Sequence, residues 1–174
     1  TDMLKAMKRG ITREKTESLI ETIREKVPGI ALRTTLISGF PGETEKDFQE
    51  MYDWVERSRF DRLGIFTYSH EENTSAYVLE DNVPAEVKQE RADQIMELQS
   101  GISYEINQQK VGQTLKVLFD KKEADYLIGR SEFDSPEVDN EVVVRDGSEE
   151  LIGKFAQVKI DRADHYDLYG SIIQ

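Results

Sequence analysis

Two short segments combine glycine, hydroxyl, aromatic and carboxylate groups in places where an α/β fold binds its ligands. They are residues 38–43 (SGFPGE) and residues 67–72 (TYSHEE), and each lies at the carboxyl end of a predicted strand. In parallel α/β folds, ligands bind beyond the carboxyl ends of the strands. Gly39 has no Cβ, so a flat ring or a phosphate can approach its backbone, and the helix that follows offers N–H groups to an anion. A plain turn is the alternative, because Pro-Gly is a common turn dipeptide.

Other kinds of chemistry are excluded by residues that the sequence lacks. It contains no cysteine and two histidines, His70 and His165. Without cysteine, this chain can supply no disulfide, thiol nucleophile, zinc ribbon or thiolate-bound iron–sulfur cluster. The two histidines are far apart in the sequence, so we expect surface or packing residues and no metal site.

The charge balance is strongly acidic. The chain has 35 acidic and 23 basic residues, a net charge of −12, which disfavours sequence-independent binding to phosphates. An acidic surface suits a basic protein partner, although it also simply keeps a protein soluble. No apolar run approaches the roughly 20 residues that span a bilayer. The first residues do not follow the layout of a signal peptide, so we expect a cytoplasmic protein.

Helix and strand patterns alternate in the first part of the chain. Residues 13–27 carry an apolar stripe at helical spacing, and residues 31–38 are rich in the β-branched and apolar types of a buried strand. Thr44 and Asp47 form a capping-box pattern that opens a second helix, and residues 63–69 form a second strand. This order predicts a parallel sheet, as in part of an α/β barrel. Two strands cannot close a barrel, so either the missing strands lie upstream or the sheet is small and exposed.

The second part of the chain has a different pattern. After a polar loop at 70–83, Pro84 begins a long helix that runs to about residue 109. Five short segments of alternating apolar and polar residues follow within about 65 residues, which predicts a small antiparallel barrel. We therefore expect two domains, 1–109 and 110–174.

Several segments resemble a known enzyme family. Residues 35–44 (TLISGFPGET) resemble the fifth-strand motif of radical-SAM enzymes, where the strand end packs against the adenine of S-adenosylmethionine. Residues 62–69 (RLGIFTYS) and 71–76 (EENTSA) are similar to the sixth strand and loop of the methylthiotransferase branch, and residues 3–10 (MLKAMKRG) to the segment after its fourth strand. Residues 129–140 (GRSEFDSPEVDN) resemble the signature loop of the RimO type, which modifies an aspartate of ribosomal protein S-twelve. The predicted barrel resembles a TRAM domain.

This resemblance implies the fold class and the cofactors. The fold would be a partial radical-SAM α/β barrel of the TIM type, followed by a small all-β, OB-like TRAM barrel. The enzyme would be a methylthiotransferase that uses S-adenosylmethionine and four-iron four-sulfur clusters. The CxxxCxxC loop and the cluster domain of the family would lie upstream of Thr1, so we expect the chain alone to be inactive. Many radical-SAM enzymes have glycine where this chain has Thr35, so contact at that position is through a hydroxyl or is absent.

The resemblance also implies the residues of a cofactor wall. These are Ile37, Gly39, Phe66 and Tyr68, with Arg33 pointing into the same pocket. Ile37 and Phe66 also suit a barrel core, and Arg33 also suits an ion pair with a helix carboxylate. No residue of the chain is expected to act as a catalytic group or as a metal ligand.

The choice of substrate depends on the charge of the predicted barrel. Residues 110–174 contain fourteen acidic and nine basic residues, which favours a basic ribosomal protein over the transfer RNA that other enzymes of this branch modify. Glu132, Asp134, Glu137 and Asp139 form the predicted substrate-docking loop, unless the loop is merely a solvated acidic hairpin. The alternatives are a tRNA adenosine methylthiotransferase, a non-catalytic binding module, or a half-barrel kept for structure.

Overall fold

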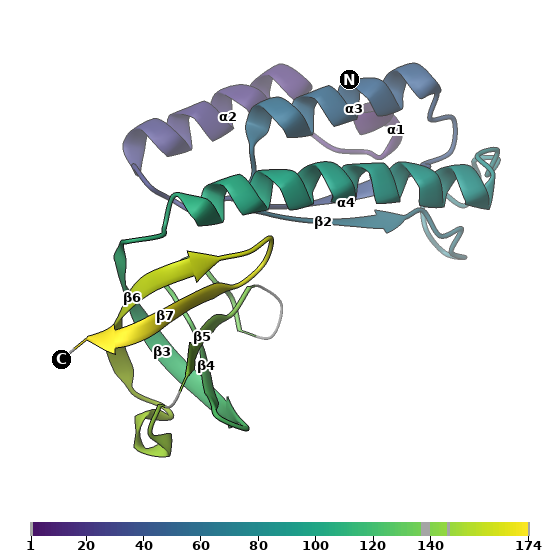
Figure 1. Cartoon of the computed structure of the whole chain (residues 1–174). Helices are drawn as coiled ribbons and strands as arrows, with labels where there is room; N and C mark the ends of the chain where they lie inside the picture. Colours follow the sequence, from purple (N-terminus) through teal and green to yellow (C-terminus); the bar gives the residue numbers. More distant parts are fainter. Residues whose placement is uncertain (1, 137–139, 146, 174) are drawn as a thin grey trace. The chain divides into compact units, whose positions relative to one another are not determined.

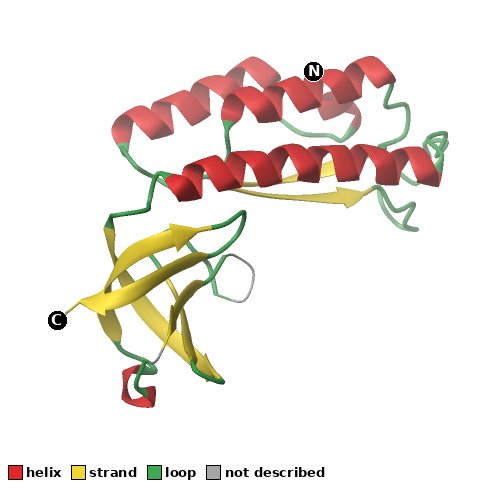
Figure 2. Cartoon of the chain, viewed as in Figure 1, coloured by secondary structure: helices red, strands yellow, loops and turns green. Residues whose placement is uncertain are grey.

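The computed structural model describes residues 2–136, 140–145 and 147–173. The chain forms two compact units, Thr1–Gln99 and Ser100–Gln174. The helices lie mainly in the first unit and the strands mainly in the second (Figure 2). Within the described ranges, none of the helices is both long enough and apolar enough to span a bilayer.

The first unit alternates helices with two strands, as the sequence predicts. Strands β1 and β2 pair in parallel from Arg33 opposite Arg62 to Ser38 opposite Thr67, and α3 connects them. The predicted parallel pair is therefore confirmed. The elements of the unit are α1 (Asp2–Ala6), α2 (Arg13–Lys26), β1 (Arg33–Ser38), α3 (Glu45–Ser58), β2 (Arg62–Thr67) and the first part of α4 (Ala85–Gln108).

Local capping determines where α3 begins. The Asp47 N–H donates to Thr44 Oγ1 at 3.2 Å, and the Thr44 N–H donates to Asp47 Oδ2 at 2.9 Å. This is the predicted capping box, and it satisfies donors that the first turn of a helix otherwise leaves unpaired. The carboxylate holds its proton weakly: the Thr44 hydroxyl and N–H lower the pKa of Asp47, although partial burial opposes them.

The helices of the first unit cover one face of the sheet (Figure 1). Phe48 and Val55 of α3, Leu63 of β2 and Ile95 of α4 are buried on this side. The side chains on the opposite face alternate with those beneath the helices. On that face Phe66 is 67% exposed. One face of the sheet is thus packed, and the other is open around Phe66 within the described residues, although Arg62 on the same face is buried.

The second unit is a closed barrel of five strands. They are joined in the order β3-β4-β5-β7-β6, and β6 pairs back to β3. The strands are β3 (Thr114–Glu123), β4 (Tyr126–Arg130), β5 (Val142–Arg145), β6 (Phe155–Ala163) and β7 (Leu168–Ile173), with a 3₁₀ turn, η1 (Glu149–Leu151), between β5 and β6. The interior is filled by Leu115, Val117, Phe119, Leu127, Val142, Val144, Val158, Ile160, Ala163 and Leu168.

The predicted five-strand barrel is confirmed, but the prediction that it is entirely antiparallel was wrong. Strands β5 and β7 run parallel, with Val142 opposite Leu168, while the other pairs are antiparallel. The reason is geometric. Strand direction can alternate all the way round a closed ring only if the number of strands is even, so a ring of five needs at least one parallel pair.

The last part of α4 belongs to the second unit and holds the β6–β7 hairpin. The fully buried Asn107 donates from Nδ2 to the carbonyl oxygens of Asp164 and Tyr166 at 3.2 and 3.1 Å. Gln108 donates to the carbonyl oxygen of Ala163 at 2.9 Å. The two compact units therefore divide the chain within α4, and the division into domains 1–109 and 110–174 stays a prediction.

Candidate functional site

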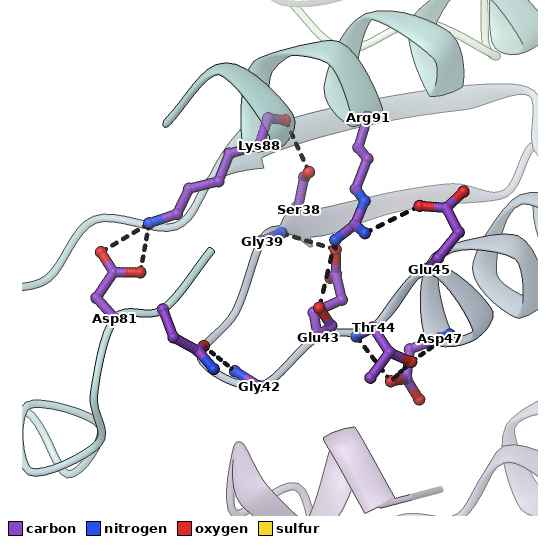
Figure 3. Close-up of polar contacts among 11 residues, drawn as sticks. Ser38, Gly39, Gly42, Glu43, Thr44, Glu45, Asp47, Asp81, Lys88 and Arg91 are labelled. Carbon is purple, nitrogen blue, oxygen red and sulfur yellow. Dashed lines mark hydrogen bonds and ion pairs between the residues drawn. The ribbon is translucent and has the colours of Figure 1, made fainter. Parts of the chain in front are cut away.

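The carboxyl ends of β1 and β2 lie side by side, and the pairing continues beyond them. The Tyr68 N–H donates to the Ser38 carbonyl oxygen at 2.8 Å, one step after Ser38 pairs with Thr67. The turn after β1 and the loop after β2 therefore start from adjacent points at one end of the sheet. Figure 3 shows the polar contacts that fix these segments.

Gly39 occupies a backbone conformation that favours glycine. Its φ is +74°, and its N–H donates to Glu43 Oε1 at 3.1 Å. The space that a Cβ would fill is occupied by the methylene groups of Lys88. The close approach to Gly39 in this structure is thus made by a lysine stem, on the side where a side chain would project.

A buried ion pair joins the turn after β1 to α4. Arg91 Nη1 lies 2.8 Å from Glu43 Oε1, and the two side chains are only 8% and 6% exposed. Arg91 Nη2 also contacts Glu45 Oε2 at 3.0 Å. Burial raises the pKa of Glu43, although the hydrogen bonds from Gly39 and Arg91 act in the opposite direction. The Glu43 carboxylate therefore bridges the Gly39 backbone and the helix.

Lys88 makes a second connection between α4 and the strand ends. Its Nζ lies 2.7 Å from both carboxylate oxygens of Asp81 and 3.3 Å from the Tyr68 carbonyl oxygen. Close to this ion pair, Asn82 Oδ1 accepts the Gly42 N–H at 2.8 Å. Asp81 and Asn82 end the loop that follows β2, so this loop is tied both to α4 and to the turn after β1 (Figure 3).

Aromatic rings pack beside these ion pairs. The Tyr68 ring meets Phe40 edge-on, with centroids 5.3 Å apart, and the Lys88 ammonium lies 5.0 Å from the Tyr68 centroid. His70 stacks on Tyr77 at 4.7 Å, in agreement with the expectation that it is a surface or packing residue. Desolvation, together with nearby acidic groups, raises the pKa of Tyr68.

The structure brings four of the five predicted cofactor-wall residues to one end of the sheet. Ile37 pairs with Phe66, and Gly39 and Tyr68 follow just beyond the two strands. Arg33 is exposed and lies at the opposite end of β1, roughly 20 Å from Gly39 at the usual rise of a strand. The binding roles of all five residues stay predictions.

An apolar cavity of about 420 Å³ runs beside β1. Its lining includes Met3, Met7, Ile37, Met51 and Trp54. Within the described part of the chain, the buried Trp54 Nε1 has no hydrogen-bond partner.

Sequence reasoning missed Lys88 and its partner Asp81. The ion pair of Arg91 was missed as well, although a charged residue at an apolar position of a helix is a usable signal for a buried ion pair. Lys88 stands on the same side of the helix, seven residues before the buried Ile95, but its partners could not be predicted because they lie in segments that are distant in the sequence. Among the residues that the structure describes, no group of three or more histidine, aspartate or glutamate side chains is placed to hold a metal ion.

The predicted docking loop is only partly described. Glu132 is exposed, whereas Asp134 accepts hydrogen bonds from the Ser131 hydroxyl at 2.6 Å and from its N–H at 3.3 Å. Asp134 thus closes a local turn. Glu137 and Asp139 lie outside the described residues.

Comparisons with known proteins cover both units. Residues 111–173 match the TRAM domain family. Over its whole length the chain is 61% identical to the ribosomal protein uS12 methylthiotransferase RimO of Cytophaga hutchinsonii, and it covers 40% of that protein. The proteins with the same name from Christiangramia forsetii and Bacteroides thetaiotaomicron are 58% and 53% identical over 97% and 99% of the chain, which covers 38% and 40% of them. The chain therefore spans about two fifths of the length of these relatives.

Proposed function

Because the chain is related along its whole length to methylthiotransferases of the RimO type, we propose that it is part of an enzyme that methylthiolates an aspartate of ribosomal protein S-twelve. The end-to-end match carries this proposal, because it includes the strand ends of the first unit as well as the TRAM barrel. The alternative of a tRNA adenosine methylthiotransferase is not favoured by these relatives.

In this proposal the first unit, continued to residue 109, is part of a radical-SAM α/β barrel, and residues 110–174 form the TRAM domain. The open sheet face supports the first half of the proposal. Phe66 is 67% exposed on that face, and a Cβ added to Gly64 would meet no other heavy atom within 4 Å. An exposed aromatic ring on an uncovered part of a sheet face suits a face that further structure or a bound ligand covers.

The residues at the strand ends suit one wall of a site for S-adenosylmethionine. Ile37 and Phe66 offer apolar surface to a flat ring, and Tyr68 follows at the same end of the sheet. When bound with an iron–sulfur cluster, the cofactor supplies the radical that takes a hydrogen from the substrate. The task of this chain is to hold the adenine end of the cofactor and to keep water from it. Since the sequence has no cysteine, the cluster ligands come from the rest of the enzyme, and the chain alone is inactive.

The second unit is the docking module for the basic ribosomal protein. Residues 110–174 contain five more acidic than basic residues, so the average charge attracts a basic protein and repels RNA phosphates. The exposed Glu132 is available to a partner, whereas the Asp134 carboxylate is occupied by Ser131. The enzyme would act in the cytoplasm, where ribosomes are assembled.

A binding experiment tests the choice of substrate. The chain is titrated with ribosomal protein S-twelve and, separately, with tRNA at low and moderate salt. We expect binding to S-twelve that weakens as salt is added, and weaker binding after Glu132→Lys but not after Glu150→Lys, an exposed position on η1. Preference for tRNA would support the alternative enzyme and reject the proposed substrate.

An activity experiment tests the class of enzyme. The full-length protein with reconstituted clusters should add a methylthio group to S-twelve, detected by mass spectrometry of the modified peptide. The 174-residue chain under the same conditions should add none. Modification of S-twelve by the chain alone would reject the proposal that the cluster ligands come from the rest of the enzyme.

A further inference from the structure

Lys88 is a buried charged residue whose position is unusual for a lysine. The residue is 6% exposed, and an ammonium removed from water costs several kcal/mol unless it is closely paired. Its Nζ lies 2.7 Å from both oxygens of Asp81, so the ion pair is bidentate. The Asp81 side chain is 27% exposed, which places the pair at the border between the packed helix and the loop after β2.

The stem of Lys88 is interlocked with the backbone of Gly39. The methylene groups pass through the space that a Cβ at position 39 would need, and Gly39 has a φ of +74°. A shift of the lysine stem therefore removes the support of this turn. Conversely, no other residue type at position 39 leaves the lysine its path.

The two ends of Lys88 hold the two strand ends. At the backbone, its carbonyl oxygen accepts the hydroxyl of the fully buried Ser38 at 2.8 Å. At the tip, its ammonium contacts the Tyr68 carbonyl oxygen at 3.3 Å and lies 5.0 Å from the Tyr68 ring centroid. One side chain thus connects the end of β1, the end of β2 and the loop beyond.

We propose that Lys88 is a positioning residue: clamped by Asp81, it fixes the Gly39 backbone and the Tyr68 ring in the geometry that receives the adenine of S-adenosylmethionine. The identity of the ligand rests on the function proposed above. Lys88 itself does not touch the cofactor in this proposal. Its stem and its charge act through Gly39 and Tyr68.

Two substitutions separate the charge of Lys88 from its bulk. Lys88→Met keeps an unbranched stem beside Gly39 and removes the ammonium, and Asp81→Asn leaves the lysine in place but removes the charge that holds it. A matched control is Lys46→Met, since the Lys46 side chain lies in the same unit and is 86% exposed. Asp81→Asn also keeps the test open if Lys88→Met fails to fold, because Asp81 lies in the loop at the border of the packed helix and the substitution keeps the size of its side chain.

The first measurement needs no cofactor. In NMR spectra of the chain, Lys88→Met and Asp81→Asn should shift the Gly39 amide and the Tyr68 ring signals. They should also speed hydrogen exchange of the Tyr68 N–H, which donates to Ser38. The signals of the barrel should stay unchanged. Wild-type signals at Gly39 and Tyr68 in both variants would overturn the positioning role, whether or not the proposed function is correct.

The second measurement uses the full-length protein and S-adenosylhomocysteine, an analogue that cannot react. We expect each substitution to weaken binding by about tenfold, a change of about 1.4 kcal/mol, and the double variant to be little worse than either, since both remove one ion pair. With S-adenosylmethionine, KM should rise while KM for S-twelve stays the same. Lys46→Met should change nothing.

The two proposals fail in different ways. If the unmodified protein does not bind the analogue but the NMR signals move, the positioning role stands and the proposed ligand is wrong. If the unmodified protein binds the analogue and both variants bind equally well, Lys88 is only a packing residue.

Discussion

The two sheets of this molecule differ in whether their edge strands are paired. The barrel of the second unit closes on itself, so each strand has two neighbours, and its interior is one continuous apolar core. In the first unit, β1 and β2 pair only with each other among the described strands, and Phe66 is exposed on the uncovered face. The barrel is therefore complete as a sheet, whereas each strand of the parallel pair has one neighbour among the described strands.

Substitution of one phenylalanine in each sheet tests this difference most directly. Phe119→Ala removes a fully buried ring from the barrel and should lower the free energy of unfolding by about 3–5 kcal/mol. Phe66→Ala removes a ring that is 67% exposed and should change it by no more than ~0.5 kcal/mol. Denaturant titration followed by NMR signals of each unit measures both. Equal losses would mean that the open face is packed in solution.

A second test concerns how the first unit holds its strand ends without a closed sheet. Arg91→Met leaves Glu43 as a buried carboxylate without its cation, and we expect a loss of about 3 kcal/mol at neutral pH. The loss should appear in thermal unfolding of the first unit, with Lys46→Met as the control.

The same variant has a defined pH dependence. Burial raises the pKa of Glu43 in the folded protein above its ordinary value of 4.5, so the folded state binds more protons than the unfolded state in the interval between the two values. Stability therefore falls as pH rises through that interval. Without Arg91 the folded pKa rises further, so Arg91→Met should regain stability on acidification from neutral pH. A variant whose deficit stays constant from neutral pH down to 4.5 would contradict this explanation.

Substitution of one glycine in each sheet should show the same difference, with a smaller change in the free energy of unfolding. A Cβ on Gly170 in β7 would overlap the Lys159 carbonyl oxygen and Val158 Cγ1, whereas one on Gly64 in β2 would meet nothing within 4 Å. Gly170→Ala should therefore cost about 1–3 kcal/mol, and Gly64→Ala should be neutral or slightly stabilising. In the full-length protein, Gly64→Ala should cease to be neutral if other strands or a ligand cover this face.

The smallest expected effect is a loss of barrel stability at low pH, which appears as an acid limb in the plot of unfolding free energy against pH. Asp164 is partly buried, which by itself would raise its pKa, but hydrogen bonds from the Asp167 and Tyr166 N–H groups and from the Tyr169 hydroxyl produce a net lowering. Its stabilising contribution is thus present at neutral pH and is lost as pH falls below 3.8, the ordinary value, through the folded pKa. Asp164→Asn should flatten this limb in unfolding measurements, and Asp125→Asn, at an exposed turn position, should not.

Much of the fold follows from local sequence patterns. The pairing of Thr44 with Asp47 marks the start of α3, and Pro84 marks the start of α4, because caps and proline act on the nearest turn of the helix. The alternation of helices and strands predicted the parallel pair, and the spacing of apolar residues predicted five barrel strands. The parallel pairing of β5 with β7 was missed, although the odd number of strands requires a parallel pair somewhere in the ring.

The candidate site was less accessible from the sequence. Gly39 and Tyr68 could be located because Gly39 directly follows one predicted strand and Tyr68 lies near the carboxyl end of the other. The role of Lys88 depends on three segments meeting in space: the turn at Gly39, the loop at Asp81 and helix α4. A local sequence pattern cannot show that these three segments come together in the folded chain. Arg33 was grouped with Gly39 through the resemblance, but the length of β1 separates them.

The order of strands in the barrel has a consequence for how the chain folds. Strands β3 and β4 are joined by a short turn and can pair early, and the same holds for β6 and β7. Closure requires β3 to find β6, with Thr114 opposite Lys159, a pair about 45 residues apart in the sequence. Contacts of such long sequence separation form late and slow the search. We therefore expect ring closure between β3 and β6 to limit the folding rate of the barrel, with the two hairpins already formed.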